Sequence, residues 1–351
     1  MLGTRLALVA RVDDAKWNDE KALLLGRRIS ELGLAIRDTR VEQLVSRLHA
    51  ELAERGIAFR PPVYLSDEWG CPDGTPLIGV PFYLADRRLE RIEAEQSGSV
   101  ESDEEAMRYL RHEAGHALNY AFRLHERADF ASTFGDYAQP YREHYRADPF
   151  SRAHVRHILG WYAQKHPDED FAETFAVWLT PGRDWRLEYA GWPAQAKLEW
   201  VESAMRRVAA QQPAIPALSA DDVPVESMHW TVAEHYEESD PLAVGDGRQF
   251  DDDLRRVFAT SADAPVGERA AVFLERHEGE LVVRLSYWAG VAPAAARALL
   301  RSLRERSLAQ QLHVAGLEAA TLIELTAFGT AVLLHWRYTR VGDTPSHSHD
   351  T

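Results

Sequence analysis

The sequence predicts an α+β protein in which a small sheet and a helical lobe are followed by a mainly α-helical C-terminal domain. Three observations predict this class. The chain has 351 residues, which favours two domains over one. Short β-branched and aromatic runs gather in residues 59–85, while helical periodicity fills much of the remainder. With 45% hydrophobic residues the chain can bury one or two cores, so wholesale disorder is excluded.

The N-terminal elements follow from this periodicity. Apolar residues at helical spacing predict helices over residues 18–34 and 39–55. Two short apolar runs, residues 63–65 and 77–84, are separated by turn residues and predict two or three strands of a small sheet.

A strong helix is predicted to begin after Ser102, because Glu105 three residues later completes a capping box. Residues 128–150, with prolines and many aromatics, favour a loop. Apolar periodicity predicts the remaining helices over 151–163, 168–179, 193–210, 266–288, 292–308 and 317–340.

The domain boundary is predicted at a proline-containing segment. We expect a first domain over residues 1–210, a linker over 211–225, a helical C-terminal domain over 226–345 and a disordered tail over 346–351. Nine of the fifteen excess negative charges lie after residue 210. The C-terminal domain is therefore a candidate to bind a protein partner, although its role and the oligomeric state stay open.

Charge and cysteine content exclude several classes of protein. A net charge of −15 disfavours a nucleic-acid or anionic-membrane binder. Cys71 is the single cysteine, which excludes an internal disulfide and a cysteine-based metal site. Neither a signal peptide nor an uninterrupted membrane span is evident, so we expect a cytoplasmic protein.

The motif that carries chemistry is His112-Glu113-Ala114-Gly115-His116. Two histidines four residues apart on a helix lie one turn apart on the same face, so both imidazoles can reach one metal ion. The glutamate between them can accept the proton of a metal-bound water. The motif lies within the predicted capped amphipathic helix. Burying these polar side chains there would cost desolvation free energy, which a cluster without a function would not offset.

A third ligand is expected downstream. Position 122 is Phe122, so a third histidine is missing at the six-residue spacing. Glu169 and Glu173 lie one helical turn apart beside small residues, which would let their helix approach Gly115 closely. One carboxylate could then bind the metal while the other orients a histidine. The alternative is an exposed acidic helix start that complements the helix dipole.

The pattern His112-Glu113-x-x-His116 followed by Glu169-x-x-x-Glu173 resembles a zincin of the gluzincin type, and Glu169-Asp170-Phe171-Ala172-Glu173 is similar to its lethal-factor-like branch. The wider text over residues 30–205 resembles a bacterial family called putative zinc-binding metallopeptidases. The resemblance implies a zincin-like fold and a bound Zn²⁺. It implies these roles: His112, His116 and Glu169 as zinc ligands, Glu113 as general base, Glu173 behind the ligands and Tyr162 as oxyanion donor, with His157 as a weaker candidate.

We therefore expect a zinc-dependent metallopeptidase that hydrolyses a peptide or protein substrate by a zinc-activated water, with Glu113 as general base. Two alternatives stay open. One is a catalytically inactive zincin-fold binding module, and the other is a zinc hydrolase of a non-peptide substrate, which shares the metal chemistry and differs only in the pocket. The substrate's identity and the choice between endopeptidase and exopeptidase stay open as well.

Overall fold

The structure is a computed structural model. It describes residues 16–97, 99–141, 145, 147–159, 161–209, 211–215, 224–238, 247–260, 267–291 and 293–339. The chain divides into two compact units. The first comprises Met1–His144, Arg152–His157 and Ala163–Asp240, and the second comprises Tyr145–Ser151, Ile158–Tyr162 and Pro241–Thr351. Most of the predicted linker and the predicted C-terminal tail lie outside the described residues.

The first unit contains a short sheet and most of the long helices. Its strands β1 and β2 run parallel, with Val63 opposite Ile78 and Ser66 opposite Pro81. The mixture of helices with this two-stranded sheet is consistent with the predicted α+β class. After a first helix over residues 16–25, the bounds are η1 (Ile29–Glu31), α2 (Arg40–Glu54), β1 (Val63–Ser66), β2 (Ile78–Pro81), η2 (Phe82–Ala85), α3 (Arg87–Ser97), α4 (Asp103–Ala121), η3 (Leu124–Glu126), α5 (Ala128–Phe134), η4 (Tyr162–Gln164, whose first residue belongs to the second unit), α6 (Pro167–Leu179), α7 (Trp185–Glu188), α8 (Ala194–Val208), η5 (Val225–Ser227) and α9 (Val232–Glu238).

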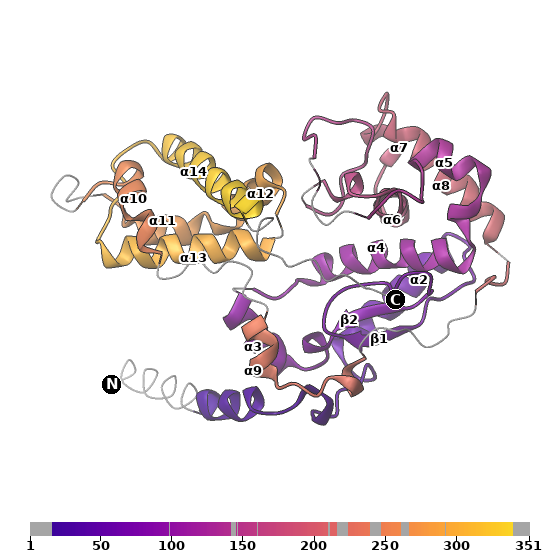
Figure 1. Ribbon diagram of the computed structural model, residues 1–351, viewed down its shortest axis with the longest axis horizontal. Coiled ribbons are helices and arrows are strands. Elements are labelled where there is room, and N and C mark those ends of the chain that lie inside the picture. The colour runs from indigo at the N-terminus through magenta and orange to yellow at the C-terminus, as the bar shows by residue number, and fades with distance from the viewer. Residues whose placement is uncertain are drawn as a thin grey trace, which may run out of the picture. The chain divides into compact units, whose positions relative to one another are not determined.

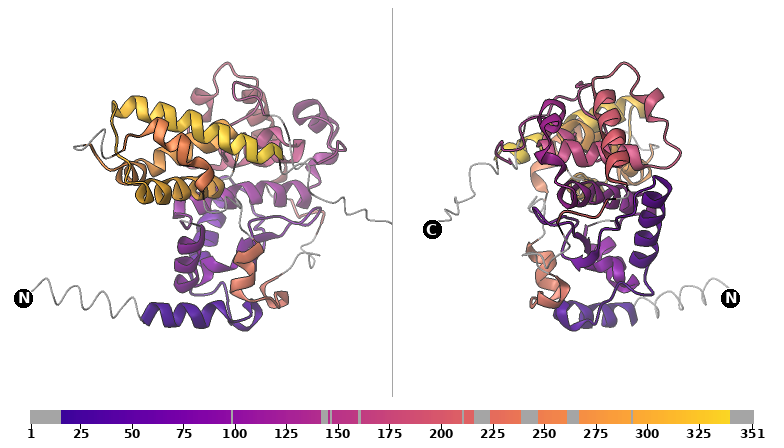
Figure 2. Two further views of the ribbon diagram at one scale, coloured as in Figure 1. Left: turned by 60° about the vertical axis from the view of Figure 1, so that its left-hand side comes forward. Right: turned by 90° about the vertical axis from the view of Figure 1, so that its right-hand side faces the viewer.

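Helix α4 is the central element of this unit. It lies between α2 with the small sheet on one side and α5, α6 and α8 on the other (Figures 1 and 2). The Ser102 hydroxyl accepts from the backbone N–H of Glu105 and the Glu105 carboxylate accepts from that of Ser102, so the predicted capping box forms. Every residue from Leu110 to Ala121 is buried, because partners cover α4 all round.

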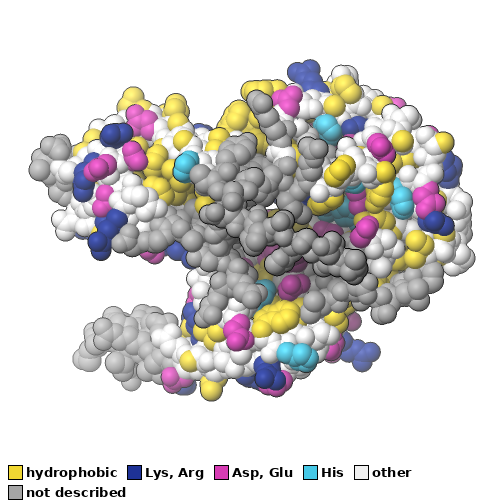
Figure 3. All heavy atoms as spheres, in the orientation of Figure 1, with side chains coloured by type: hydrophobic (Ala, Val, Ile, Leu, Met, Phe, Trp, Pro, Cys, Tyr) yellow, Lys and Arg dark blue, Asp and Glu magenta, His cyan; other side chains and the backbone are white. Residues whose placement is uncertain are grey.

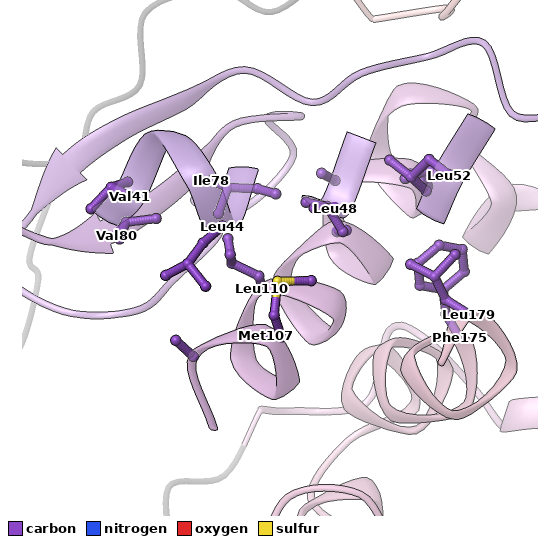
Figure 4. Packing of buried hydrophobic residues seen from close by; sticks show 14 of the residues in the cluster. Val41, Leu44, Leu48, Leu52, Ile78, Val80, Met107, Leu110, Phe175 and Leu179 are labelled. Carbon is purple, nitrogen blue, oxygen red and sulfur yellow. The ribbon is translucent and has the colours of Figure 1, made fainter. Parts of the chain in front are cut away.

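Apolar side chains from four elements fill the space around α4. In Figure 4 they converge from α2, β2, α4 and α6 on one cluster. The apolar stripe predicted for residues 39–55 is the α2 part of this cluster. The labelled members are Val41, Leu44, Leu48, Leu52, Ile78, Val80, Met107, Leu110, Phe175 and Leu179.

A buried ion pair fixes α2 against α4. The Arg111 guanidinium donates from Nε and Nη2 to the two carboxylate oxygens of Glu51, each at 2.7 Å. Both side chains are buried. A shift of α2 along α4 would separate the two groups and leave each as an uncompensated buried charge. The bidentate pair therefore fixes the register between the two helices.

Helices α4 and α6 approach each other most closely at Gly115. A Cβ added to Gly115 would lie 2.7 Å from Cα of Ala172 and 3.2 Å from its Cβ. The expectation that small residues let the two helices meet is confirmed. At this contact no side chain of Gly115 separates the backbone of α4 from that of α6, so the two helices pack closely.

The regular elements of the second unit's described part are helices, apart from isolated β-bridges at His313, and the unit has its own apolar core. Two short segments before α6 cluster with it: the Trp161 ring lies 4.7 Å from the Tyr287 ring, and the Tyr287 hydroxyl donates to the Pro149 carbonyl at 3.3 Å. Its further elements are η6 (Arg248–Phe250), α10 (Asp251–Val257), α11 (Ala270–Arg276), α12 (Glu278–Ala289), α13 (Pro293–Ala309) and α14 (Glu318–Thr339).

Helix α14 is the one described helix whose length and composition would allow it to cross a membrane, over Glu318–Trp336. It packs against α12 and α13. Leu322, Leu325 and Leu333 of this helix are buried in the core of the second unit.

Several predicted boundaries differ from the structure. The first helix ends at Leu25 and not at residue 34, because the backbone N–H groups of Ile29 and Ser30 donate to the carbonyls of Trp230 and Met228. Residues 224–232 accordingly join the first core through Val225, Met228 and Val232, so the units divide later in the chain than the predicted linker.

The helix predicted over 151–163 is wrong. The described residues there are irregular up to η4, because their polar groups find tertiary partners: the Arg156 N–H donates to the Tyr189 hydroxyl and His157 Nε2 donates to the Arg108 carbonyl. Conversely, α5 forms inside the predicted loop, α3 was missed, and a break at His277 divides the helix predicted over 266–288.

Replacing Gly115 with alanine is expected to lower the free energy of unfolding by at least about 1 kcal/mol. The new methyl group would meet backbone atoms of Ala172 that cannot yield without separating α4 from α6, and such overpacking outweighs the gain in helix propensity. Urea denaturation followed by tryptophan fluorescence measures the change. Gly279→Ala in α12 is the matched control, because a Cβ at that position meets nothing within 4 Å. Equal stability of Gly115→Ala and the wild type would contradict the close approach.

Candidate metal centre

Helix α4 presents the first three candidate residues. His112, Glu113 and His116 lie in its buried second half and can each offer a ligand atom, with these atoms within 4.8 Å of one another. The two imidazole rings have their centroids 4.8 Å apart, as expected one helical turn apart. The predicted HExxH constellation is therefore assembled inside the protein and not on a solvated face.

Helix α6 presents the acidic residues opposite. It begins with His166 as N-cap, whose Nδ1 accepts from the backbone N–H of Asp168, and with Pro167 at the first helical position. Asp168, Glu169 and Glu173 are all buried. The reading of this segment as an exposed acidic helix start is wrong, because α6 is buried along its whole length.

Three atoms converge between the two helices. The Nε2 atoms of His112 and His116 are 3.1 Å apart. The Oε2 atom of Glu169 lies 3.1 Å from the first and 3.2 Å from the second. Among the acids of the predicted pair, Glu169 is thus the one that completes a nearly equilateral triangle of donor atoms, which we call the ligand triangle.

The other nitrogen of each imidazole contacts a carboxylate. Nδ1 of His112 lies 2.9 Å from Oε1 of Glu173, and Nδ1 of His116 lies 2.9 Å from Oδ2 of Asp168. An ionised carboxylate can only accept, so each Nδ1 carries the ring proton and each Nε2 of a neutral ring presents a lone pair. With both rings neutral, three lone-pair atoms then face one another at 3.1–3.2 Å, an arrangement that a proton or a metal cation between them would stabilise.

Zinc fits this donor set in chemistry and size. Two imidazole nitrogens and one carboxylate oxygen are a common protein ligand set for catalytic zinc, which leaves a fourth position open. Tetrahedral bonds of about 2.0–2.1 Å place the ligand atoms about 3.3 Å apart. The sides of the ligand triangle are close to that separation.

Buried carboxylates set the electrostatics of the centre. Burial lowers the pKa of His112, but hydrogen bonds with Glu169 and Glu173 outweigh it and raise the pKa to about 10. Burial of His116 is outweighed in the same way by Asp168 and Glu169, which raise its pKa well above the usual value. The field that attracts protons to these rings would also attract a metal cation, with which the protons compete.

Glu113 differs from the other acids of the centre. Burial raises the pKa of its carboxyl group, with His112 and His116 acting in the opposite sense. Within the described part of the chain no hydrogen bond to its carboxylate is found. A carboxylate with a raised pKa and free lone pairs next to the ligand triangle can exchange a proton with a water molecule.

Asp168 contacts the candidate centre and was not predicted from the sequence. Besides His116, its carboxylate accepts from the Tyr120 hydroxyl at 2.6 Å and from Asn119 Nδ2 at 2.7 Å. These three donors come from α4, so Asp168 accepts three hydrogen bonds across the helix interface, one of them from His116. The available signal was Pro167, which sets Asp168 in the same first turn as Glu169.

Two residues proposed as oxyanion donors occupy different surroundings. His157 is held by its hydrogen bond to the Arg108 carbonyl, and burial lowers its pKa to about 4, so it is neutral at physiological pH. Tyr162 begins η4 within a segment that clusters with the second unit. The oxyanion role of Tyr162 stays a prediction.

A different tyrosine contacts the ligand triangle. The Tyr141 hydroxyl donates to Oε1 of Glu169, the carboxylate oxygen that is not part of the triangle. No residue spacing pointed to Tyr141, because it lies in an irregular segment 28 residues before its partner.

Charges on the molecular surface are mixed. On the face shown in Figure 3, lysine and arginine side chains are scattered singly among acidic ones.

Asp168→Asn is expected to weaken zinc binding about 10–100-fold, because the amide is uncharged and holds the His116 imidazolium or N–H less strongly. Competition with a chromophoric chelator measures the zinc dissociation constant. Asp129→Asn is the matched control, since Asp129 pairs with Arg127 on the exposed surface. Indistinguishable zinc affinities of Asp168→Asn and the wild type would contradict the role of Asp168.

Similarity to known proteins is found for the segment that contains this centre. No curated protein and no solved structure matches the chain significantly. A protein-family model does match, over residues 95–183, which contain both α4 and α6. The family is described as "putative zinc-binding metallo-peptidase", and the chain is similar to it over these residues, which make up about a quarter of its length.

Proposed function

We propose that the protein is a zinc-dependent metallopeptidase of the zincin type and, within it, of the gluzincin type. The ligand triangle of His112, His116 and Glu169 is the single observation that carries the proposal. The family match over residues 95–183 supports peptide bonds as the substrate. We further propose that it acts in the cytoplasm, as the sequence led us to expect.

The first contribution of the protein is to hold the proposed zinc ligands in position. Glu173 and Asp168 hold the Nδ1–H groups of the two histidines, so that both Nε2 lone pairs point to one position. Zinc bound there would supply Lewis acidity, which acidifies a coordinated water and polarises a substrate carbonyl. The ligand atoms need no rearrangement for this, because their separations already suit tetrahedral geometry.

Glu113 performs the proton transfers in this proposal. Its carboxylate accepts a proton from the attacking water and delivers it to the amine that leaves when the peptide bond breaks. Its burial favours the protonated form after the first transfer, and a cation held by the ligand triangle would favour the ionised form before it. A carboxylate balanced in this way can serve as base and then as acid within one turnover.

Glu113→Gln is expected to lower peptide hydrolysis by at least about 100-fold while zinc content stays at one ion per chain, because the amide cannot accept the proton. The measurement is mass spectrometry of new N-termini in a peptide library from a cell lysate, with metal analysis of the same samples. It also reports which peptide bonds are cleaved.

Glu104→Gln in the exposed first turn of α4 is the matched control and is expected to cleave like the wild type. Chelation of the metal should abolish cleavage by the wild type, and added zinc should restore it. The same cleavage products at the same rate from Glu113→Gln or from chelated protein would contradict the proposal.

A further inference from the structure

We propose that Tyr141 is a positioning residue of the metal centre, whose phenol holds Glu169 so that the carboxylate binds the metal through Oε2 alone. The inference rests on the proposed function, because it assigns a role to the third ligand of that site. It concerns how many coordination positions the protein occupies and how many it leaves to substrate and water.

The two oxygens of Glu169 have different partners. Oε2 lies within 3.1–3.2 Å of both imidazole Nε2 atoms, whereas Oε1 accepts the hydrogen bond from the Tyr141 hydroxyl. A carboxylate can bind a metal through one oxygen or through both, and binding through both would raise the coordination number of zinc from four to five. A hydrogen bond on Oε1 turns that oxygen away from the second mode of binding.

Hydrogen bonds connect the segment before Tyr141 to the N-terminus of α6, and this connection places the Tyr141 hydroxyl next to Glu169. His166 accepts from the Asp168 N–H with Nδ1 and donates from Nε2 to the Gln139 carbonyl, 3.0 Å away. The Tyr141 ring lies 5.3 Å from the His166 ring. The Lys165 ammonium lies 4.3 Å from the centre of the Tyr141 ring, a cation–π contact that fixes the ring from another side.

Exposure distinguishes Tyr141 from the other phenol near the centre. The Tyr120 side chain is 4% exposed and supports Asp168 from within the core, whereas Tyr141 is 47% exposed. The ligands themselves are buried. Tyr141 therefore restrains Glu169 from the solvent side of the ligand triangle, so a substitution there can be tested without opening the core.

The test compares Tyr141→Phe with the wild type in the full chain, by two readouts that do not require turnover. In chelator competition, the zinc dissociation constant of Tyr141→Phe is expected to rise about 10–100-fold. With Co²⁺ in place of zinc, the visible absorption bands are expected to weaken, since five-coordinate Co²⁺ absorbs less strongly than tetrahedral Co²⁺.

Tyr83→Phe is the matched control. It removes a hydrogen bond of the same kind, from the Tyr83 hydroxyl to Oε1 of Glu101 at 2.9 Å, and neither residue belongs to the metal centre. We expect its zinc affinity and Co²⁺ spectrum to equal those of the wild type.

The outcomes separate this inference from the proposed function. Zinc affinity and a Co²⁺ spectrum of Tyr141→Phe that match the wild type and Tyr83→Phe would overturn the positioning role and leave the peptidase proposal standing. A wild type that binds zinc through Tyr141-supported Glu169 but cleaves no peptide would overturn the peptidase proposal alone. A wild type that binds no zinc would overturn both.

Discussion

The close approach of α4 and α6 at Gly115 is the constraint on which the rest of the site depends. A side chain at this position would force the backbones apart. The atoms of the ligand triangle are contributed by both helices. Moving the helices apart would therefore lengthen the separations of 3.1–3.2 Å between the histidines and Glu169. The Arg111–Glu51 pair fixes α4 from its other side. The packing of α4 against α6 thus sets the separation of the three ligand atoms.

Electrostatics explains why a cation belongs there. Four buried carboxylates, those of Glu113, Asp168, Glu169 and Glu173, surround two imidazole rings. An uncompensated buried charge is costly, and folding with four of them requires protons or metal. Asp168 and Glu173 each accept a hydrogen bond from the Nδ1–H of one histidine. The Nε2 lone pair of each ring is then left for the position that the two rings share. In the proposed zinc site, these same acids would create the affinity for a divalent ion.

Sequence reasoning reached the parts of the site that follow helical spacing. His112 and His116 are four apart, Glu169 and Glu173 are four apart, and small residues predicted the helix contact at Gly115. Asp168 and Tyr141 could not be found in this way. Tyr141 meets Glu169 through a loop path that no local pattern encodes. For the same reason the helix predicted over 151–163 was wrong, since its polar groups are satisfied by partners distant in sequence.

The central claim is that two imidazole nitrogens and one carboxylate oxygen bind a single zinc ion, and X-ray absorption at the zinc edge of the purified protein tests it most directly. The account predicts one zinc per chain, nitrogen and oxygen neighbours at about 2.0–2.1 Å and the outer-shell scattering of two imidazole rings. Protein without zinc would contradict it. A sulfur neighbour at about 2.3 Å would contradict it as well, because that distance would place the single cysteine, Cys71, on the metal in place of Glu169.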